Sequence, residues 1–305
     1  MILIVGATGN LGGHVARQLL AKGHLVRAMT RDSSRARALE AMGAEVVRGD
    51  LRDPPSLREA LRGTRAVVSA AHSILGVGNS SSARVDDEGQ RALIDAAKEA
   101  GVGHFVFTSV LGASADHPVD FWRTKERVEQ HLKQSGVRYT IIRPSAFMEI
   151  YAYELIGKAV MAGKRVVMFG QGDSPRNMIA SVDVATYVVR ALEDEQWHGE
   201  TLEVGGPRNV SGAEILALFE TMAGAKAKVT RIPLPVLRVL ASVAGSVHQG
   251  VGRILKAAIV AETTDQTFDP APLMARCPMV LTPLEEWAVA HVGRPGAAPA
   301  ETVMA

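Results

Sequence analysis

Three glycines near the start of the chain have the spacing of a loop that binds a diphosphate. Gly6, Gly9 and Gly12 follow the apolar run 2–5 and precede a helical pattern that ends at Gly23. In such a loop the first glycine permits a tight turn, the second lets the backbone approach the phosphates, and the third lets helix and strand pack closely. The helix N-terminus adds free N–H groups and a partial positive charge. We therefore predict a dinucleotide site rather than a glycine-rich turn of another kind. Its loop residues are Gly6, Thr8, Gly9, Asn10, Leu11 and Gly12.

The residues that follow the second predicted strand indicate which dinucleotide binds. An acidic side chain at this place accepts hydrogen bonds from the ribose hydroxyls of NAD. Here the strand ends at Thr30 and Arg31, with two serines and a second arginine shortly beyond, and guanidinium and hydroxyl donors suit a 2′-phosphate. We predict NADP as the cofactor, with Arg31 as a ligand. Asp32 leaves NAD open, because a shift of one residue would place its carboxylate at the ribose.

Small and polar residues stand where the other predicted strands end, which is where ligands bind in open α/β sheets. Asp50 and Leu51 follow the third strand and are expected to accept from the amino group of an adenine and to pack on its ring. Ala70 and Ala71 end the fourth strand and leave room for a ribose or a nicotinamide. The further predicted cofactor ligands, at the ends of the fifth and sixth strands, are Thr108 and Pro144.

A parallel sheet is needed to bring these residues to one edge, and the sequence predicts one. Six apolar segments alternate with helical patterns and occupy residues 2–5, 25–30, 45–48, 65–71, 105–110 and 139–144. Strand and helix that alternate without a break are typical of a doubly wound α/β fold. We therefore predict a Rossmann-type doubly wound parallel sheet, followed by a smaller α/β domain toward the C-terminus.

The composition is that of a soluble globular protein. The chain has 305 residues, of which 47% are hydrophobic and 22% charged, and a formal net charge of +2 without a long basic run, so we expect no nucleic acid partner. The single cysteine, Cys277, excludes an intramolecular disulfide. Residues 2–5 suit a core strand rather than a signal peptide, and no apolar stretch reaches the ~20 residues of a membrane span. We expect a cytoplasmic protein and find no spacing typical of metal ligands.

In the order of its motifs the chain resembles the extended or atypical short-chain dehydrogenases/reductases, and among them the NmrA-like group. The matching stretches are 6–12, 49–51, Gly89 with 96–97, 108–109, 143–144 and 182–185. The resemblance implies that a later segment returns to the main sheet, which makes the substrate domain discontinuous. The implied domains are residues 1–148 and 177–206 for the dinucleotide, residues 149–176 and 207–292 for the substrate, and a flexible tail at 293–305.

One departure from the family bears on catalysis. Catalytic members carry Tyr-x-x-x-Lys, in which the tyrosine is the general acid/base and the lysine lowers its pKa and holds the nicotinamide ribose. This chain keeps the lysine as Lys125 but has Phe121 in the tyrosine position. By resemblance to NmrA-like and isoflavone-reductase-like relatives, Lys125 binds the ribose or transfers a proton, and Ser109 is the candidate for the assisting serine. The alternative is a surface lysine paired with Glu129, one helical turn away.

Apolar and aromatic residues after the sixth strand predict a site for a flat hydrophobic substrate. Phe147, Met148 and Tyr151 lie where the superfamily places substrate, although the same residue types would suit a core. The Ala- and Val-rich segment 234–261 is predicted to form two helices that cover the substrate cleft or form an oligomer interface. A monomer and a homodimer both remain open.

Two functions are compatible with these features. The first is an NAD(P)H-dependent oxidoreductase that reduces a hydrophobic quinone or carbonyl, with protons from solvent or Lys125. The second is a non-catalytic NADP(H)-binding redox sensor, regulator or assembly factor, which Phe121 favours because phenylalanine has no proton to transfer. We favour the enzyme, because the dinucleotide loop, the lysine and the apolar segment are all retained.

Overall fold

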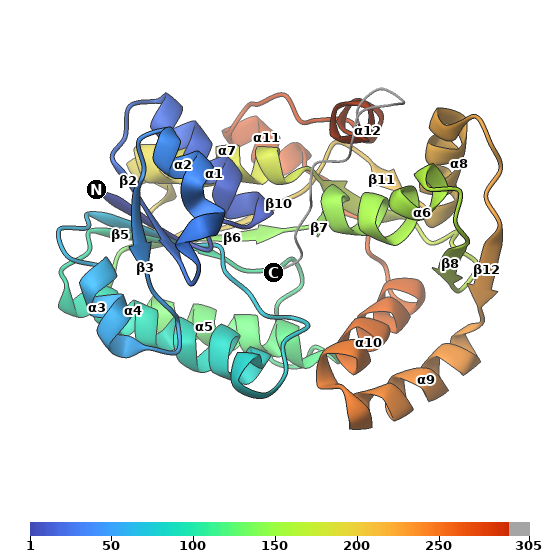
Figure 1. The fold of residues 1–305 in the computed structure, drawn as a ribbon, viewed down its shortest axis with the longest axis horizontal. Helices are drawn as coiled ribbons and strands as arrows, with labels where there is room; N and C mark the ends of the chain where they lie inside the picture. Colours follow the sequence, from blue (N-terminus) through green and yellow to red (C-terminus); the bar gives the residue numbers. More distant parts are fainter. Residues whose placement is uncertain (293–305) are drawn as a thin grey trace. The chain divides into compact units, whose positions relative to one another are not determined.

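The computed structural model describes residues 1–292, which form two compact units (Figure 1). The first unit contains Met1–Arg143 and Val184–Glu203, and the second contains Pro144–Asp183 and residues 204–292. The predicted tail, residues 293–305, lies outside the described residues. These bounds describe how the chain packs and not what each unit binds. The assignment of one unit to the cofactor and the other to the substrate therefore stays a prediction.

A seven-stranded sheet forms the centre of the first unit. Its strands are β1 (Ile2–Val5), β2 (Val26–Thr30), β3 (Glu45–Arg48), β4 (Ala66–Ser69), β5 (His104–Thr108), β6 (Tyr139–Pro144) and β10 (Thr201–Val204). The strand order is β10-β6-β5-β4-β1-β2-β3, and the pairs from β3 through β6 are all parallel. This order, in which the chain starts in the middle and winds outward in both directions, confirms the predicted doubly wound sheet.

Helices cover both faces of this sheet. They are α1 (Asn10–Ala21), α2 (Arg37–Ala41), α3 (Pro54–Ala60), α4 (Gln90–Glu99), α5 (Asp120–Ser135) and α7 (Ser181–Glu193). Helices α3, α4 and α5 lie on one face, and α1, α2 and α7 lie on the other (Figure 1). The strands are therefore buried from both sides, which explains why they are continuous apolar runs rather than alternating ones.

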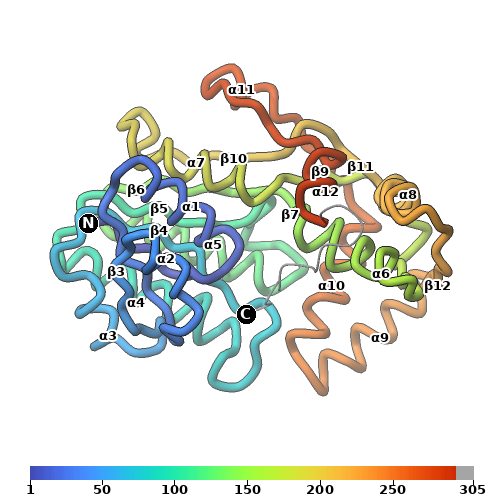
Figure 2. Tube along the Cα trace, turned by 45° about the horizontal axis from the view of Figure 1, so that its top comes forward, coloured from blue at the N-terminus to red at the C-terminus, as the bar shows by residue number. Residues whose placement is uncertain are grey.

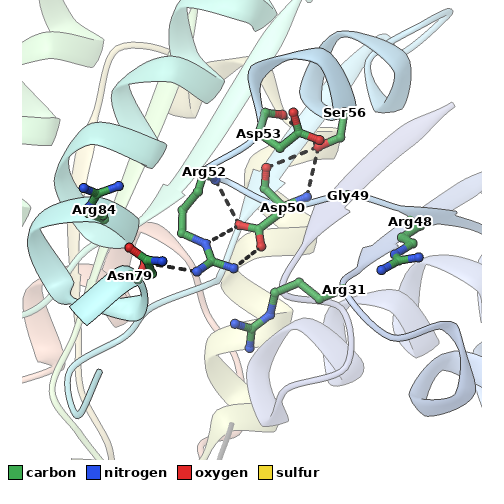
Figure 3. Close-up of a pocket in the computed structure, with 9 residues that line it drawn as sticks. All are labelled: Arg31, Arg48, Gly49, Asp50, Arg52, Asp53, Ser56, Asn79 and Arg84. Atoms are coloured by element: carbon green, nitrogen blue, oxygen red, sulfur yellow. Dashed lines mark hydrogen bonds and ion pairs between the residues drawn. The ribbon is translucent and has the colours of Figure 1, made fainter. Parts of the chain in front are cut away.

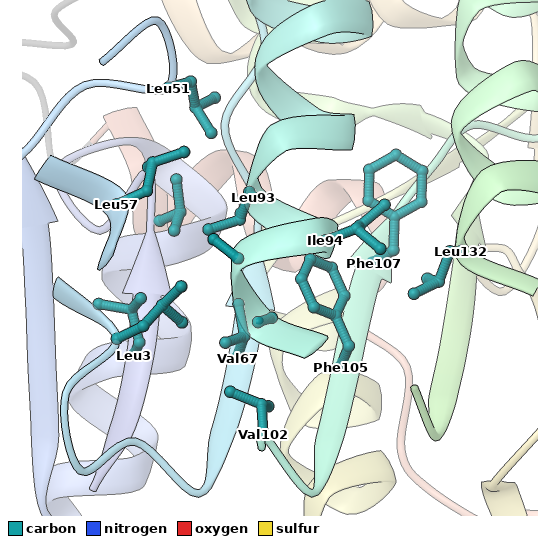
Figure 4. Packing of buried hydrophobic residues seen from close by; sticks show 14 of the residues in the cluster. Leu3, Leu51, Leu57, Val67, Leu93, Ile94, Val102, Phe105, Phe107 and Leu132 are labelled. Carbon is teal, nitrogen blue, oxygen red and sulfur yellow. The ribbon is translucent and has the colours of Figure 1, made fainter. Parts of the chain in front are cut away.

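A continuous hydrophobic core lies between the sheet and the helices α3, α4 and α5 (Figure 4). Leu3, Val67 and Phe105 come from three neighbouring strands and are fully buried. Leu93 of α4 and Leu132 of α5 pack against the same cluster. Burial of each such side chain stabilises the fold by about 1.5–3 kcal/mol. The core therefore fixes the strands, and with them the strand ends at which the candidate ligands stand.

The second unit combines two small sheets with helices. Its strands and helices are β7 (Ala146–Phe147), α6 (Lys158–Met161), β8 (Val166–Phe169), β9 (Arg176–Ile179), β11 (Asn209–Val210), α8 (Gly212–Ala223), β12 (Val229–Ile232), α9 (Leu234–Val247), α10 (Gln249–Thr263), α11 (Ala271–Arg276) and α12 (Leu284–Val292). Strand β9 pairs in parallel with β7 and antiparallel with β11, and β8 pairs in parallel with β12. The Ala- and Val-rich segment forms two helices, α9 and α10, as predicted (Figure 2). Within residues 1–292, none of the helices combines the length and the hydropathy that crossing a membrane requires.

A buried histidine at the start of β5 makes the stability of the first unit depend on pH. The ring of His104 meets the ring of His198 edge-on at 4.4 Å, and its Nε2 lies 3.0 Å from the Thr140 hydroxyl. Burial, together with the positive charges of His198 and Arg138, lowers the pKa of His104 to about 4. In the unfolded chain a histidine titrates near pH 6.5. The unfolded state therefore binds more protons between pH 6.5 and 4, and stability falls as the pH falls through that window.

We expect His104 to remove up to about 3 kcal/mol of unfolding free energy between pH 7 and pH 4. The substitution His104→Gln keeps an amide for hydrogen bonding but cannot titrate, so it should flatten that part of the pH dependence. Urea unfolding of both proteins at a series of pH values measures the effect. The difference between them above pH 7 gives the pH-independent cost of the substitution, and parallel curves down to pH 4 would refute the assignment.

Candidate functional site

The glycine loop joins the end of β1 to the start of α1, and each glycine has a different structural reason. Gly6 has a φ of +87°, and a Cβ there would lie 2.8 Å from the Ala71 nitrogen. A Cβ on Gly12 would lie 2.2 Å from the Gly6 carbonyl oxygen. A Cβ on Gly9 would meet only that same oxygen, at 3.4 Å, in ordinary van der Waals contact. The fold thus requires glycine at Gly6 and Gly12, whereas at the exposed Gly9 it leaves room for a side chain.

The N-terminus of α1 is open toward this loop. Gly9 is the N-cap residue, no side chain of the described chain caps the helix, and its first turn has no acidic residue. Thr8, Gly9 and Asn10 are exposed in part or in full, whereas Leu11 is buried against the core. Uncapped N–H groups at a helix N-terminus suit an anion. The structure thus brings the predicted loop residues together at an uncapped helix N-terminus, and their role toward a diphosphate stays a prediction.

Ala70 and Ala71 follow β4 directly opposite this loop. The Ala70 nitrogen donates to the Val5 carbonyl oxygen at 2.9 Å. The buried Gln90 donates to the Ala71 carbonyl oxygen at 3.1 Å and accepts from the Ser69 hydroxyl at 2.7 Å. Both alanines are partly exposed. Their backbone is therefore fixed beside Gly6, and the room that their small side chains would leave for a ribose or a nicotinamide stays a prediction.

A cavity of about 570 Å³ lies at the ends of β2 and β3 (Figure 3). It is lined by Arg31, Arg48, Gly49, Asp50, Arg52, Asp53, Ser56, Asn79 and Arg84. The side chains of Arg31, Arg48 and Arg84 are exposed and form no hydrogen bond or ion pair with any residue in 1–292. Three guanidinium groups without an ion pair, together with Arg52, outnumber the carboxylates of Asp50 and Asp53 in the lining and make the cavity attractive to a phosphate group. Sequence reasoning found Arg31 here but missed Arg48, Arg52 and Arg84, because strand β3, the loop after it and the π-helical segment Ala83–Gly89 come together only in the folded chain.

Asp50 is engaged differently from what the sequence predicts. Arg52 donates from Nε to Asp50 Oδ1 at 2.9 Å and from Nη2 to Oδ2, while its Nη1 donates to the Asn79 carbonyl oxygen at 3.0 Å (Figure 3). The hydrogen bond from Arg52 holds the pKa of Asp50 below its usual range. Leu51 is 5% exposed and packs in the core. An adenine amino group would therefore share the Asp50 carboxylate with Arg52, and the roles of Asp50 and Leu51 toward adenine stay predictions.

The structure contradicts the alternative in which Lys125 is a surface lysine paired with Glu129. Lys125 is 3% exposed, and its Nζ donates to the Thr108 carbonyl oxygen at 2.9 Å. The rings of Phe107 and Phe121 lie 4.7 and 5.5 Å from the same nitrogen. Burial lowers the pKa of Lys125, against the opposing charges of Asp86 and Glu129. The helical spacing of Phe121, Val128 and Leu132 around Lys125 indicates this inner face of α5, and the surface alternative did not take it into account.

The hydroxyl of Thr108 is the second unusual group at this strand end. Thr108 is the last residue of β5, and its Oγ1 is buried without a hydrogen-bond partner among the residues described. Buried hydroxyls are nearly always hydrogen-bonded, so an orphan at a strand end suggests a ligand. The predicted ligands Lys125 and Thr108 are in direct contact through the ammonium group and the Thr108 backbone carbonyl, and the unpartnered hydroxyl belongs to the same threonine.

Ser109 belongs to a separate network. Its hydroxyl donates to the fully buried carboxylate of Glu129, which is also held by Arg143 through bonds of 2.7 and 3.0 Å. Arg143 in turn lies 3.3 Å from Glu203. The structure therefore pairs Lys125 with Thr108 and gives Ser109 a carboxylate partner. A catalytic role for Ser109 remains a prediction that would require this hydrogen bond to be released or shared.

A buried aspartate fixes the segment next to Lys125. Asp86 is fully buried and accepts from the Ser73 nitrogen at 2.8 Å and from the Ser82 hydroxyl at 2.6 Å. It lies on the π-helical segment Ala83–Gly89 that leads into α4, and π-helical turns are frequent at functional sites. The segment ends at Gly89, where a Cβ would lie 2.8 Å from the Leu51 Cβ. Sequence reasoning did not anticipate the π-helical turn or Asp86.

The predicted substrate residues belong to the second unit. Phe147 is half-buried in β7, and Pro144 and Met148 are buried, Met148 within a hydrophobic cluster. The ring of Tyr151 lies 5.8 Å from the guanidinium of Arg176. Burial raises the pKa of the Tyr151 hydroxyl, and the positive charge of Arg176 opposes this by lowering it. The packing of Met148 matches the alternative in which it is a core residue. The roles of Pro144, Phe147, Met148 and Tyr151 toward ligands therefore stay predictions.

Sheet order, glycine loop and flanking helices together define a Rossmann-type doubly wound α/β protein. The chain belongs to the NmrA-like family, whose model matches residues 1–287, which confirms the predicted resemblance.

Several known proteins are similar over most of their length. The structure of the NADPH-dependent quinone oxidoreductase QOR2 of Escherichia coli in complex with NADPH is 26% identical, with a TM-score of 0.76 over 95% of this chain and 99% of that chain. The NAD(P)H azoreductase of Xenophilus azovorans is 34% identical over 77% of this chain and 78% of its own. The photosystem II assembly factor Ycf39 of Synechocystis is 30% identical over 96% of this chain and 91% of its own.

The glycine loop yields a test that separates folding from binding. The substitution Gly9→Val adds a side chain where the fold has room and a phosphate would lie. We expect an unfolding temperature close to that of the wild type and NADPH affinity reduced by about a hundredfold. Calorimetric titration and a thermal melt measure the two quantities.

Gly12→Ala is the matched control for this prediction. Its Cβ would lie 2.2 Å from the Gly6 carbonyl oxygen, so we expect it to destabilise the fold by about 2 kcal/mol. Wild-type affinity for NADPH in Gly9→Val would refute the assignment of the loop to the diphosphate.

Proposed function

We propose that this protein is an NADPH-dependent reductase that transfers hydride to a hydrophobic quinone or a related conjugated acceptor, without a catalytic tyrosine. The observation that carries the proposal is the group formed by Lys125 and Thr108. It combines a buried ammonium with a lowered pKa and an unpartnered hydroxyl at the end of β5. The two relatives named as a quinone oxidoreductase and an azoreductase support the same class of reaction.

The described residues fit a phosphorylated dinucleotide on two observations of this structure. The uncapped N-terminus of α1 with open space at Gly9 suits the diphosphate, and the cavity that Arg31 lines suits a 2′-phosphate. Gly6, Ala70 and Ala71 would hold the ribose side, and Thr108 with Lys125 would hold the nicotinamide end. When bound, NADPH supplies the hydride. NAD remains the alternative cofactor, because Asp32 follows Arg31 directly.

Lys125 supplies the proton in this proposal. Its Nζ has three N–H bonds, of which one donates to the Thr108 carbonyl oxygen. The faces of Phe107 and Phe121 stabilise the cation without removing its protons. Since burial lowers the pKa of Lys125, the ammonium is a stronger acid than a lysine in water. Lys125 is therefore suited to protonate or to hydrogen-bond an oxyanion as negative charge develops on the acceptor.

A second candidate function is a non-catalytic NADP(H)-binding factor. Phe121 favours it, because the family's proton-donating phenol is replaced by a hydrocarbon ring. The relatives that are named photosystem II assembly factors favour it as well. Under this hypothesis the same residues bind the dinucleotide, but no acceptor is reduced. Both hypotheses therefore predict binding of NADP(H), but only the reductase predicts turnover of an acceptor.

Arg31 should determine the preference for NADPH over NADH. We expect Arg31→Ala to weaken NADPH binding by about tenfold to a hundredfold, because a charge-assisted hydrogen bond to the 2′-phosphate contributes about 1.5–3 kcal/mol. NADH lacks this phosphate, so its affinity should change little. Titration of both cofactors measures the ratio, and Arg37→Ala, at an exposed position in α2, is the control. Equal losses for the two cofactors would show that Arg31 does not contact the 2′-phosphate.

Lys125→Met should separate the enzyme from the binding factor. We expect kcat for a quinone to fall by about a hundredfold or more, while Phe121→Tyr keeps the wild-type rate for the quinone because the phenol is not needed. In the wild type, kcat should fall as the pH rises through the lowered pKa of Lys125, since only the protonated amine donates. Stopped-flow oxidation of NADPH with a panel of quinones, azo dyes and aldehydes measures these rates.

The outcome of that panel decides between the two functions. Tight NADPH binding with turnover that depends on Lys125 supports the reductase. Tight NADPH binding without turnover of any acceptor, including those of the azo class, would overturn the reductase and support the binding factor. Turnover that is unchanged in Lys125→Met would leave the reductase standing but reject Lys125 as its proton donor.

A further inference from the structure

Asp86 is a buried carboxylate whose hydrogen-bond partners are both neutral. It is fully buried, and it accepts from the Ser73 nitrogen at 2.8 Å and from the Ser82 hydroxyl at 2.6 Å. It forms no ion pair with any residue in 1–292. Removing a carboxylate from water is costly unless hydrogen bonds and an opposite charge compensate for the lost hydration. Two neutral donors supply only part of this compensation, so we looked for a cation nearby.

Lys125 is the buried cation at the same end of the sheet. Gln90, on the next turn after Asp86, accepts from the Ser69 hydroxyl, and Ser69 lies opposite Phe107 in the register of β4 and β5. The π-helical segment Ala83–Gly89 also packs directly against α5. Lys125, like Asp86, forms no ion pair within the described chain. Two buried groups of opposite charge therefore lie at neighbouring strand ends without a direct bond between them.

Three titratable groups interact electrostatically with Lys125 among the residues described. Burial lowers the pKa of Lys125, and the charges of Asp86 and Glu129 raise it, with the larger effect from Asp86. Glu129 is held by Arg143 through bonds of 2.7 and 3.0 Å, which largely neutralise its charge. Desolvation lowers the pKa of His72, the charge of Asp86 raises it and that of Lys125 lowers it. The His72 imidazole is therefore mostly neutral at pH 7 and does not replace Lys125 as the cation near Asp86.

We propose that Asp86 is a positioning residue for Lys125, whose buried carboxylate keeps the ammonium group charged at the end of β5. The carboxylate acts through space and not through a hydrogen bond, so the ammonium keeps N–H bonds for a ligand. A direct ion pair, such as that of Glu129 with Arg143, would occupy those bonds. The proposal deepens the proposed reductase and rests on it for the kinetic consequence, whereas the charge pairing is a property of the protein without cofactor or acceptor.

Asp86→Asn tests the proposal, because it removes the charge and keeps the shape. The amide still accepts from the Ser73 nitrogen and can donate to the Ser82 hydroxyl oxygen. We expect the pKa of Lys125 to fall further, so that the ammonium titrates about one pH unit lower than in the wild type. Carbon-13 NMR of labelled lysine side chains measures the titration without cofactor or acceptor, and the signal missing from Lys125→Met identifies Lys125. For the reductase, the pH at which kcat falls should move by the same amount.

Asp87→Asn is the matched control, since it makes the same substitution at the next residue of the π-helical segment. Asp87 forms ion pairs with Arg91 at 2.8 Å and with Arg127 at 2.7 Å, so the loss of its charge should leave the titration of Lys125 unchanged. Ser82→Ala removes a hydrogen bond from Asp86 and keeps the charge, and it should also titrate like the wild type. An equal shift in Ser82→Ala and Asp86→Asn would show that Asp86 only shapes the loop, and would overturn the proposal.

The NMR titration separates this proposal from the proposed reductase. An unchanged Lys125 titration in folded Asp86→Asn overturns the charge pairing, whether or not the protein reduces an acceptor. A shifted titration in a protein that turns over no acceptor supports the charge pairing and counts against the reductase instead.

A double variant keeps the proposal testable if Asp86→Asn does not fold alone. Asp86→Asn with Lys125→Met removes both buried charges, so neither is left without its counter-charge. We expect the double variant to fold and to melt at a higher temperature than Asp86→Asn. Thermal melts followed by circular dichroism compare the two, and the opposite order would overturn the proposal.

Discussion

The geometry at the carboxyl end of the parallel sheet depends on one close contact, between the Gly6 carbonyl group and the first turn of α1. A Cβ on Gly12 would lie 2.2 Å from the Gly6 oxygen, and a Cβ on Gly6 would lie 2.8 Å from the Ala71 nitrogen. Two glycines therefore let a helix, the end of β1 and the turn after β4 meet within backbone contact distance. This meeting directs the uncapped N-terminus of α1 toward the strand ends. Strands β2, β4, β5 and β6 are ordered outward from β1 in one parallel sheet. The candidate ligands at their ends therefore have fixed positions relative to the N-terminus of α1.

Glu129 and Lys125, one turn apart on α5, are both buried charged groups, but only Glu129 has an oppositely charged partner within hydrogen-bond distance. The Glu129 carboxylate is fully buried but is held by Arg143 and by the Ser109 hydroxyl, so its desolvation is offset by a charge and hydrogen bonds. The Lys125 ammonium is buried as deeply, yet its hydrogen-bond partner is the neutral Thr108 carbonyl, with two aromatic rings around it. The first arrangement ties α5 to β5 and β6. The second leaves a cation incompletely neutralised, which is the usual condition of a group that acts on a ligand.

The sequence was sufficient for the sheet and the glycine loop but not for the surroundings of each side chain. The strands of the sheet and the glycine loop are each encoded by residues close together in the sequence. The apolar runs and the glycine spacing therefore predicted both elements correctly. The expected partner of Lys125 in the alternative interpretation was wrong, because i to i+4 spacing shows that two residues can meet and not that the pair faces solvent. The arginines around the cavity and the orphan hydroxyl of Thr108 depend on segments that meet only in the folded chain, whereas the Asp50–Arg52 pair is local but is not implied by the residue types alone.

The absence of a tyrosine restricts the kind of substrate that the proposed reductase can use. Hydride addition to an aldehyde or a ketone produces an alkoxide, which is so basic that an acid must be in place as the bond forms, and Phe121 cannot be that acid. Hydride addition to a quinone produces an aromatic phenolate, and addition to an azo bond places charge on a conjugated nitrogen. The phenolate is a far weaker base than an alkoxide, so a single ammonium group of lowered pKa can stabilise and then protonate it, whereas the nitrogen anion needs a proton as the bond forms. A buried lysine between two phenylalanine rings is a poor replacement for the tyrosine in carbonyl reduction, but it is adequate for acceptors whose own conjugation carries the charge. The replacement at position 121 therefore narrows the substrate class and does not by itself argue against catalysis.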